Sequence, residues 1–303
     1  MRTGPDLRGG QHMDLSAFVT QSIGALSTAS SLFIVAAGLT LVFGALRLIN
    51  IAHGSFYMYG ALAATTVVGW FPDSGFWIAL IVGPLVALVM GVGVEMGVLR
   101  RLYGREHLTQ LLATFALLLI FADLALRFWG KNVRSINPPK VVNGNFGLVG
   151  ARVPAYDMVI IAAAIVVGGG LWLLLTHTTL GWKIRAVVDD PEVLVCSGVN
   201  IRMLYTGVFG LGALLAGLAG VVIAPQQAVG PGMDAQIIVA AFIVAVIGGL
   251  GSITGAAIGS LIIGIAETLG ANLAPSWAST FIYLLMIVVL AVRPWGLLGT
   301  PER

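Results

Sequence analysis

Charged side chains are scarce in this sequence: 10% of its 303 residues are Asp, Glu, Lys or Arg, whereas 58% are hydrophobic. A water-soluble domain carries about 25% charged residues. Several apolar runs reach the roughly 20 residues that a helix needs to cross a membrane core about 30 Å thick. The short segments of alternating polarity that a membrane β-barrel requires are absent. The composition therefore predicts an all-α, polytopic bundle of transmembrane helices.

The sequence also lacks the motifs of nucleotide, metal and hydrolytic chemistry. Its one Gly-Lys pair, Gly130-Lys131, precedes asparagine and not the Ser or Thr of a phosphate-binding loop. His-Glu-x-x-His, paired cysteines and Gly-x-Ser-x-Gly do not occur. We therefore expect no enzyme, no catalytic residue, no metal site and no cofactor in this chain.

Cysteine and net charge are low as well. The single cysteine, Cys196, has no partner for an internal disulfide. The net charge of +3 comes without a basic stripe interleaved with aromatics, so a nucleic-acid partner is not expected. The polar start, residues 1–12, is treated as a disordered or non-native tail, separate from a single membrane domain over residues 13–303.

About eight membrane segments are expected, one or two of them broken or re-entrant. Arg100, Arg101 and Arg105 form the densest basic cluster, which marks the cytoplasmic side. The polar connection over residues 130–154 is expected outside. The last but one segment is expected to be a hairpin that enters and leaves on the outer side. The segments cover residues 16–46, 51–70, 76–99, 108–129, 155–175, 203–224, 237–270 and 277–292.

A polar island over residues 176–202 separates two long hydrophobic segments. Within it, Asp189, Asp190 and Pro191 open a short run that Gly198 closes, the order of an N-cap, a first-turn proline and a C-terminal glycine. A short helix is predicted there, on the cytoplasmic side. The island is either an ordinary solvated loop or a docking surface, in which a fixed helix transmits force from a soluble partner.

Polar side chains at membrane depth mark two further places. Asn50, His53, Ser55 and Tyr57 are either an interfacial patch or part of a broken segment that faces a path. Glu267 is a lone carboxylate in an apolar run, and so is either a functional group or an interfacial group with a hydrogen-bond partner.

Glycine is abundant, with 40 residues. Gly248, Gly249 and Gly251 predict an interrupted helix whose exposed backbone groups need a cavity or a neighbouring segment. Small residues recur every four positions and predict smooth faces for close helix packing. These residues are Gly212, Ala216 and Gly220 in one segment, and Gly251, Gly255 and Gly259 in the next.

Several motifs in order resemble one family. They are Gly181-x-x-x-Arg185-Ala186-x-x-x-Asp190-Pro191-Glu192, Ser197-Gly198-Val199-Asn200, Asn50-x-Ala-His53-Gly, Ile247-Gly-Gly-x-Gly-Ser-x-x-Gly-Ala and Arg293-Pro-Trp-Gly. From about Leu15 to its end the chain resembles the LivH type of permease subunit in ABC importers for branched-chain amino acids, the hydrophobic amino acid uptake family.

The resemblance implies a partnership in the bacterial cytoplasmic (inner) membrane, among its lipids. This chain would form a heterodimer with a second, LivM-like permease, above two ABC ATPase subunits that bind ATP and Mg, and an extracytoplasmic binding protein would deliver the substrate. It implies a coupling helix around residues 186–200. The implied ATPase-coupling residues are Gly181, Arg185, Ala186, Asp189, Asp190, Pro191, Glu192, Gly198 and Asn200. The expected translocation-path residues are Asn50, His53, Ser55, Tyr57, Gly248, Gly249, Gly251 and Glu267.

Other functions stay open at this point. An ion-coupled secondary transporter would need titratable groups at mid-depth, which are limited to Glu267 and His53. A scaffold without a path would not need interrupted, polar segments. Within the importer class, relatives also carry other amino acids, amides, urea or aromatic acids.

Overall fold

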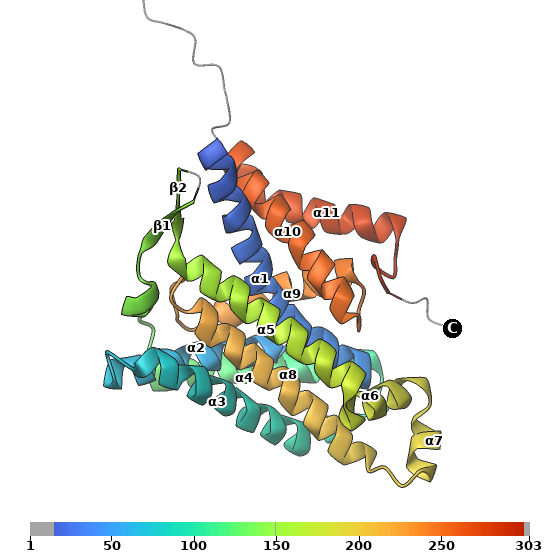
Figure 1. Cartoon of the computed structure of the whole chain (residues 1–303). Helices are drawn as coiled ribbons and strands as arrows, with labels where there is room; N and C mark the ends of the chain where they lie inside the picture. Colours follow the sequence, from blue (N-terminus) through green and yellow to red (C-terminus); the bar gives the residue numbers. More distant parts are fainter. Residues whose placement is uncertain (1–14, 149, 300–303) are drawn as a thin grey trace, which may run out of the picture.

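The computed structural model describes residues 15–148 and 150–299, so residues 1–12 lie outside the described part. It is a bundle of helices with one small β-hairpin (Figure 1). The helices are α1 (Leu15–Leu46), α2 (His53–Trp70), α3 (Gly75–Gly97), α4 (His107–Trp129), α5 (Ala155–His177), α6 (Thr179–Asp189), α7 (Pro191–Cys196), α8 (Ile201–Ile223), α9 (Met233–Gly248), α10 (Ile253–Leu273) and α11 (Ala278–Val292). Short 3-10 turns cover Leu99–Arg101, Lys140–Val142 and Pro275–Trp277, and the antiparallel strands are β1 (Asn145–Leu148) and β2 (Ala151–Pro154).

Within the described residues, six helices are long and apolar enough to cross a membrane: α1, α3, α4, α5, α8 and α10. The apolar helices α9 and α11 are shorter. The remaining long helix, α2, has 18 residues and is almost entirely buried. The predicted polytopic helical fold is confirmed. The connection over residues 130–154 contains the β-hairpin and one of the 3-10 turns.

The bundle has two chemically distinct ends, with β1 and β2 at one and α6 and α7 at the other (Figure 1). At the hairpin end, Lys140 Nζ lies 2.7 Å from Asp73 Oδ1 and joins the 130–154 connection to the turn between α2 and α3. The hydrogen bond and the charge of Lys140 lower the pKa of Asp73. At the other end, Arg100 contacts Thr206 in the first turns of α8. The basic cluster therefore shares an end with α6 and α7.

Helices α1 and α8 form the centre. In the most apolar window of each, 78% and 72% of residues are buried, whereas the value for α4 is 17%. Helix α2 packs against α8, α3 and α9, and α3 also lies along α8. Burial of apolar side chains alone does not bring helices together in lipid, so close backbone packing must contribute.

Glycines provide that close packing. A Cβ at Gly38 would lie 2.8 Å from the carbonyl oxygen of Gly212, and one at Gly220 would collide with the carbonyl oxygen of Tyr57. On α10, a Cβ at Gly259 would lie 2.7 Å from the Val244 oxygen, and Gly255 lies against Gly248. The small-residue rows thus lie where the backbones of neighbouring helices touch. Ala216, in the row on α8, is fully buried.

Candidate functional site

Helix α6 is fixed to the end of α5 by a tight joint. The N-cap of α6 is Thr178, whose Oγ1 accepts a hydrogen bond of 3.2 Å from the Gly181 N–H. A side chain at Gly181 would collide with the carbonyls of Leu174 and Leu175. From one turn further on, Arg185 Nη1 donates to the Leu175 carbonyl oxygen. The guanidinium group satisfies an orphan carbonyl at the C-terminus of α5, where a cation is favoured.

Helices α6 and α7 rest on the bundle through an apolar face. Ile184, Val187 and Leu194 are buried, and α6 contacts both α1 and α8. The opposite face carries Trp182 and Lys183, both exposed. Two helices that pack on the bundle with one face and expose the other have the form of a docking surface. We call residues 179–196 the ledge.

A second tight joint leads from α7 into α8. Gly198 has a φ of 77°, the left-handed conformation of a helix C-terminal glycine. Asn200 caps α8, because its Oδ1 accepts a hydrogen bond of 3.2 Å from the Met203 N–H. Helix α7 begins at Pro191, as predicted. The ledge is thus joined to α5 and to α8 by short turns, each with a capping hydrogen bond.

The sequence reading of the island gave one short helix, and the structure corrects this to two. Helix α6 has 11 residues. Leu180, Ile184 and Val187 follow an i, i+4, i+7 pattern, which places them on one helix face among polar neighbours. Among the predicted coupling residues, Asp190 is exposed and interacts within the chain, and Ala186 is half-buried. The side chains of Asp189, Pro191 and Glu192 lie outside the described residues.

A buried carboxylate joins α3 to α8 just above the ledge. Glu95 is fully buried, and its Oε2 lies 3.2 Å from Arg100 Nη2. Thr206 Oγ1 donates to Glu95 Oε2 at 2.7 Å, and the Tyr103 hydroxyl donates to Oε1 at 3.1 Å. Burial, followed by the nearby Glu95 charge, raises the pKa of Tyr103, so its hydroxyl remains a donor.

The predicted path residues at the start of α2 are buried in this chain. His53 Nε2 lies 3.3 Å from the Val35 carbonyl oxygen of α1, and Ser55 Oγ donates to Asp234 Oδ2 at 3.2 Å. Tyr57 accepts a hydrogen bond from Gln227. Within the described residues, both side-chain polar atoms of Asn50 and the Nδ1 of His53 have no hydrogen-bond partner. These atoms are buried polar groups that the closed packing leaves unsatisfied.

The glycine-rich break between α9 and α10 lies against the C-terminal segment. Leu297 and Leu298 donate their backbone N–H groups to the carbonyls of Ile247 and Gly248, at 2.9 and 3.0 Å. Gly249 and Gly251 have φ angles of 106° and 86°, which only glycine adopts without strain. Orphan carbonyls of the broken helix are thereby satisfied. The neighbour that the sequence required is thus the chain's own end, which the Arg293-Pro-Trp-Gly motif leads into.

Glu267 lies apart from the other predicted path residues. It is half-buried on α10, and no contact of its carboxylate is recorded within the described part of the chain. Sequence reasoning missed Asp234 and Gln227, which contact the Ser55 and Tyr57 side chains. A charged residue at the start of an apolar run was the available signal for Asp234, which is 1% exposed.

Comparison with known proteins relates this arrangement to one transport family. The model of the family "branched-chain amino acid transport system / permease component" matches residues 22–290. The high-affinity branched-chain amino acid transport system permease protein BraD of Pseudomonas aeruginosa is 28% identical over 94% of this chain and 97% of its own length. The corresponding LivH of Escherichia coli K12 is 29% identical, covering 94% and 96%. The fructose import permease protein FrcC of Rhizobium meliloti is 30% identical, covering 90% and 75%.

The family match covers the whole bundle, from α1 into α11, and with it the ledge, the glycine-rich break and the start of α2. The helices that could span a membrane lie in the same region. This chain therefore belongs to the family of permease components of branched-chain amino acid transport systems and is a multi-pass membrane protein.

Proposed function

We propose that this chain forms the translocation path of an ATP-driven importer together with a second, LivM-like permease. Two separate ABC ATPases would bind ATP and Mg, and an extracytoplasmic protein would deliver the substrate in the bacterial cytoplasmic membrane. The observation that carries the proposal is the ledge. The ledge lies within the part of the chain that matches a permease family, and a capping hydrogen bond of 3.2 Å holds each of its two joints to the spanning helices.

In this mechanism, the ATPases move the ledge and the ledge moves the spanning helices. A hinge of flexible residues would absorb such a movement. Here Arg185 and Thr178 hold α6 to α5, and Gly198 and Asn200 form a compact turn into α8. A displacement of the ledge is therefore passed to α5 and α8, and through the glycine contacts of α8 to α2.

The proposed substrate is a branched-chain amino acid, because two of the relatives described above are named for that transport. The similarity to a fructose permease shows that permeases with other substrates lie within the same range of identity. An ion-coupled mechanism is not favoured by membership of this family. Amides, urea and aromatic acids remain alternative substrates, to be separated by competition in an uptake assay.

Arg185→Gln is expected to uncouple transport while leaving the complex assembled. It removes an exposed charge-assisted hydrogen bond at the α5–α6 joint, which solvent limits to about 1 kcal/mol. Uptake should fall about fivefold, the factor that corresponds to that energy. Copurification of the ATPases, their rate of ATP hydrolysis and substrate uptake are measured together in proteoliposomes.

Lys183→Gln is the matched control, because Lys183 lies on the same helix and is exposed. It removes one positive charge without touching the joint, so uptake should stay near the wild-type value. Normal uptake by Arg185→Gln would contradict the role of the joint. A wild-type chain that copurifies without any ATPase would contradict the proposed function itself.

Asn50→Leu is expected to keep or raise thermal stability and to lower uptake. Burial of the Asn50 amide without a hydrogen-bond partner costs about 1–3 kcal/mol of folding free energy. Leucine has no polar group in its side chain and does not carry this cost. If Asn50 faces the path when the packing opens, its loss removes a polar contact to the substrate. Thr40→Val is the control, because Thr40 is buried and bonds only within α1. Full uptake by Asn50→Leu would remove Asn50 from the path.

A further inference from the structure

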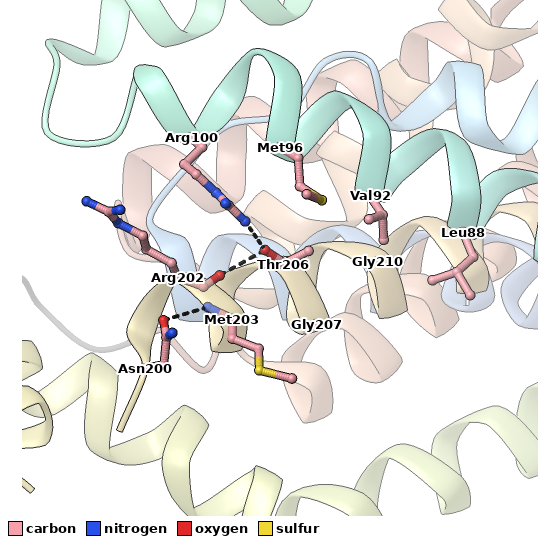
Figure 2. A pocket seen from close by; sticks show the side chains of 10 residues that line it. All are labelled: Leu88, Val92, Met96, Arg100, Asn200, Arg202, Met203, Thr206, Gly207 and Gly210. Atoms are coloured by element: carbon pink, nitrogen blue, oxygen red, sulfur yellow. Dashed lines mark hydrogen bonds between the residues drawn. The ribbon is translucent and has the colours of Figure 1, made fainter. Parts of the chain in front are cut away.

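A groove between α3 and α8 opens at the end of the bundle that carries the ledge. Its cavity has a volume of about 590 Å³, within the roughly 300–1,000 Å³ range of small-molecule sites. Leu88, Val92 and Met96 of α3 line it in a row with a spacing of four, and Met203, Gly207 and Gly210 of α8 lie opposite. Figure 2 shows Arg100 and Arg202 at one end of the groove and Leu88 at the other. The groove is therefore basic at one end and apolar along its length.

The basic end offers an unpaired positive charge. Arg100 uses Nε and Nη2 for Glu95 and Thr206, and Glu95 lies behind it, fully buried and outside the groove lining. Arg202 is exposed, and it forms no ion pair with any acidic side chain that the structure describes, a set that leaves out Asp189 and Glu192. Its guanidinium group is therefore open to an anionic group from outside the chain.

The apolar part lies along two helices that could span a membrane. Gly207 leaves the floor of the groove without a side chain, and a Cβ placed there would meet no atom within 4 Å. Met203 is 74% exposed and Met96 is 52% exposed, and flexible thioether side chains adapt to irregular apolar partners. A linear apolar slot below a basic end matches one acyl chain below a phosphate.

We propose that this groove binds an anionic glycerophospholipid from the cytoplasmic leaflet, with its phosphate at Arg202 and one acyl chain over Gly207. Basic pockets between membrane helices on the cytoplasmic side are sites for anionic headgroups, and each basic residue near such a surface contributes about 1 kcal/mol. The location suits this occupant, because the two arginines lie at the ends of apolar helices long enough to span a membrane, where headgroups are expected, and the apolar rows lie further along the same helices. Arg202 begins the helix that follows α7, so the lipid would bind beside the α7–α8 joint.

The test is native mass spectrometry of the full-length chain with the subunits that copurify, in mild detergent. Phosphatidylglycerol and phosphatidylcholine with matched acyl chains are titrated separately. Phosphatidylglycerol should bind to wild type more tightly than phosphatidylcholine, and Arg202→Gln should weaken its binding about fivefold. Gly207→Leu fills the floor without a clash at its Cβ and should abolish the same binding. Arg101→Gln is the control, since Arg101 is exposed, lies next to Arg100 and does not line the groove.

Three results would overturn the proposal. The first is equal binding of the two lipids to wild type. The second is unchanged phosphatidylglycerol binding in both groove variants, each of which remains monodisperse. The third is a photo-crosslink from position 203 to another protein subunit with no retained lipid, which would assign the groove to a partner helix. None of these readouts requires transport.

Discussion

Arg100→Gln is expected to be among the most destabilising single substitutions in this chain, at about 3 kcal/mol. It leaves the Glu95 carboxylate, whose side chain is fully buried, without a cation, and breaking a buried ion pair from one side costs about 3–5 kcal/mol. The lower end applies because Thr206 and Tyr103 still donate to the carboxylate. The melting temperature in detergent and the yield of monodisperse protein should both fall.

The double variant Arg100→Gln with Glu95→Gln separates the two partners of the pair. It removes the stranded charge, so a large part of the lost stability should return. Glu95→Gln alone should cost less than Arg100→Gln, because the Arg100 side chain is 31% exposed and can be hydrated. Arg101→Gln, on an exposed neighbour, should have little effect. Equal melting temperatures for Arg100→Gln and Arg101→Gln would contradict the stabilising role of the pair.

The partners of Glu95 show why only part of the structure was predictable. Long apolar runs define membrane helices from composition, so the ends of α4 and α5 fall within two residues of the prediction. Thr206 is 111 residues from Glu95, and nothing in the local pattern around either residue connects them. The same holds for Leu297 and Leu298, which bond to the broken end of α9 from a distant part of the chain. Contacts between residues far apart in the sequence depend on how the helices pack, so they can be identified only when the fold is known.

The site residues divide in the same way, into those whose roles depend on neighbours in the sequence and those whose roles depend on the fold. The roles of Gly198 and Asn200 depend on residues close in the sequence, because a helix C-terminal glycine and an N-cap asparagine act on their neighbours. Helix α6 was missed, because its inward-facing apolar residues, the half-buried Leu180 and the buried Ile184 and Val187, are spread among polar ones in an island that is polar on average. The assignment of the path residues depends on the proposed second permease and on a proposed movement of α2, so it stays a prediction.

Gly220→Ala is the second substitution with a large expected effect. The added methyl group would collide with the Tyr57 carbonyl oxygen and lie 2.9 Å from the Ala61 nitrogen. Both atoms are backbone, so no side-chain rotation relieves the contact, and α2 and α8 must separate. Overpacking costs about 1–3 kcal/mol or more, and separation also loosens the nearby contact of Gly60 with Gly217. The amount of folded protein in the membrane and its melting temperature should drop sharply.

Gly207→Ala, on the same helix, is the control for the loss of a glycine. Its Cβ meets nothing within 4 Å, and alanine is favoured over glycine in a helix by about 1 kcal/mol, so stability should be kept or raised. If Gly220→Ala is as stable as Gly207→Ala, α2 and α8 can separate freely. In the proposed mechanism, a movement of the ledge would then no longer reach Asn50 and His53, because the close backbone contact at Gly220 is the contact proposed to make α2 follow α8. The stability of this one variant therefore also tests whether the path residues can respond to the ledge.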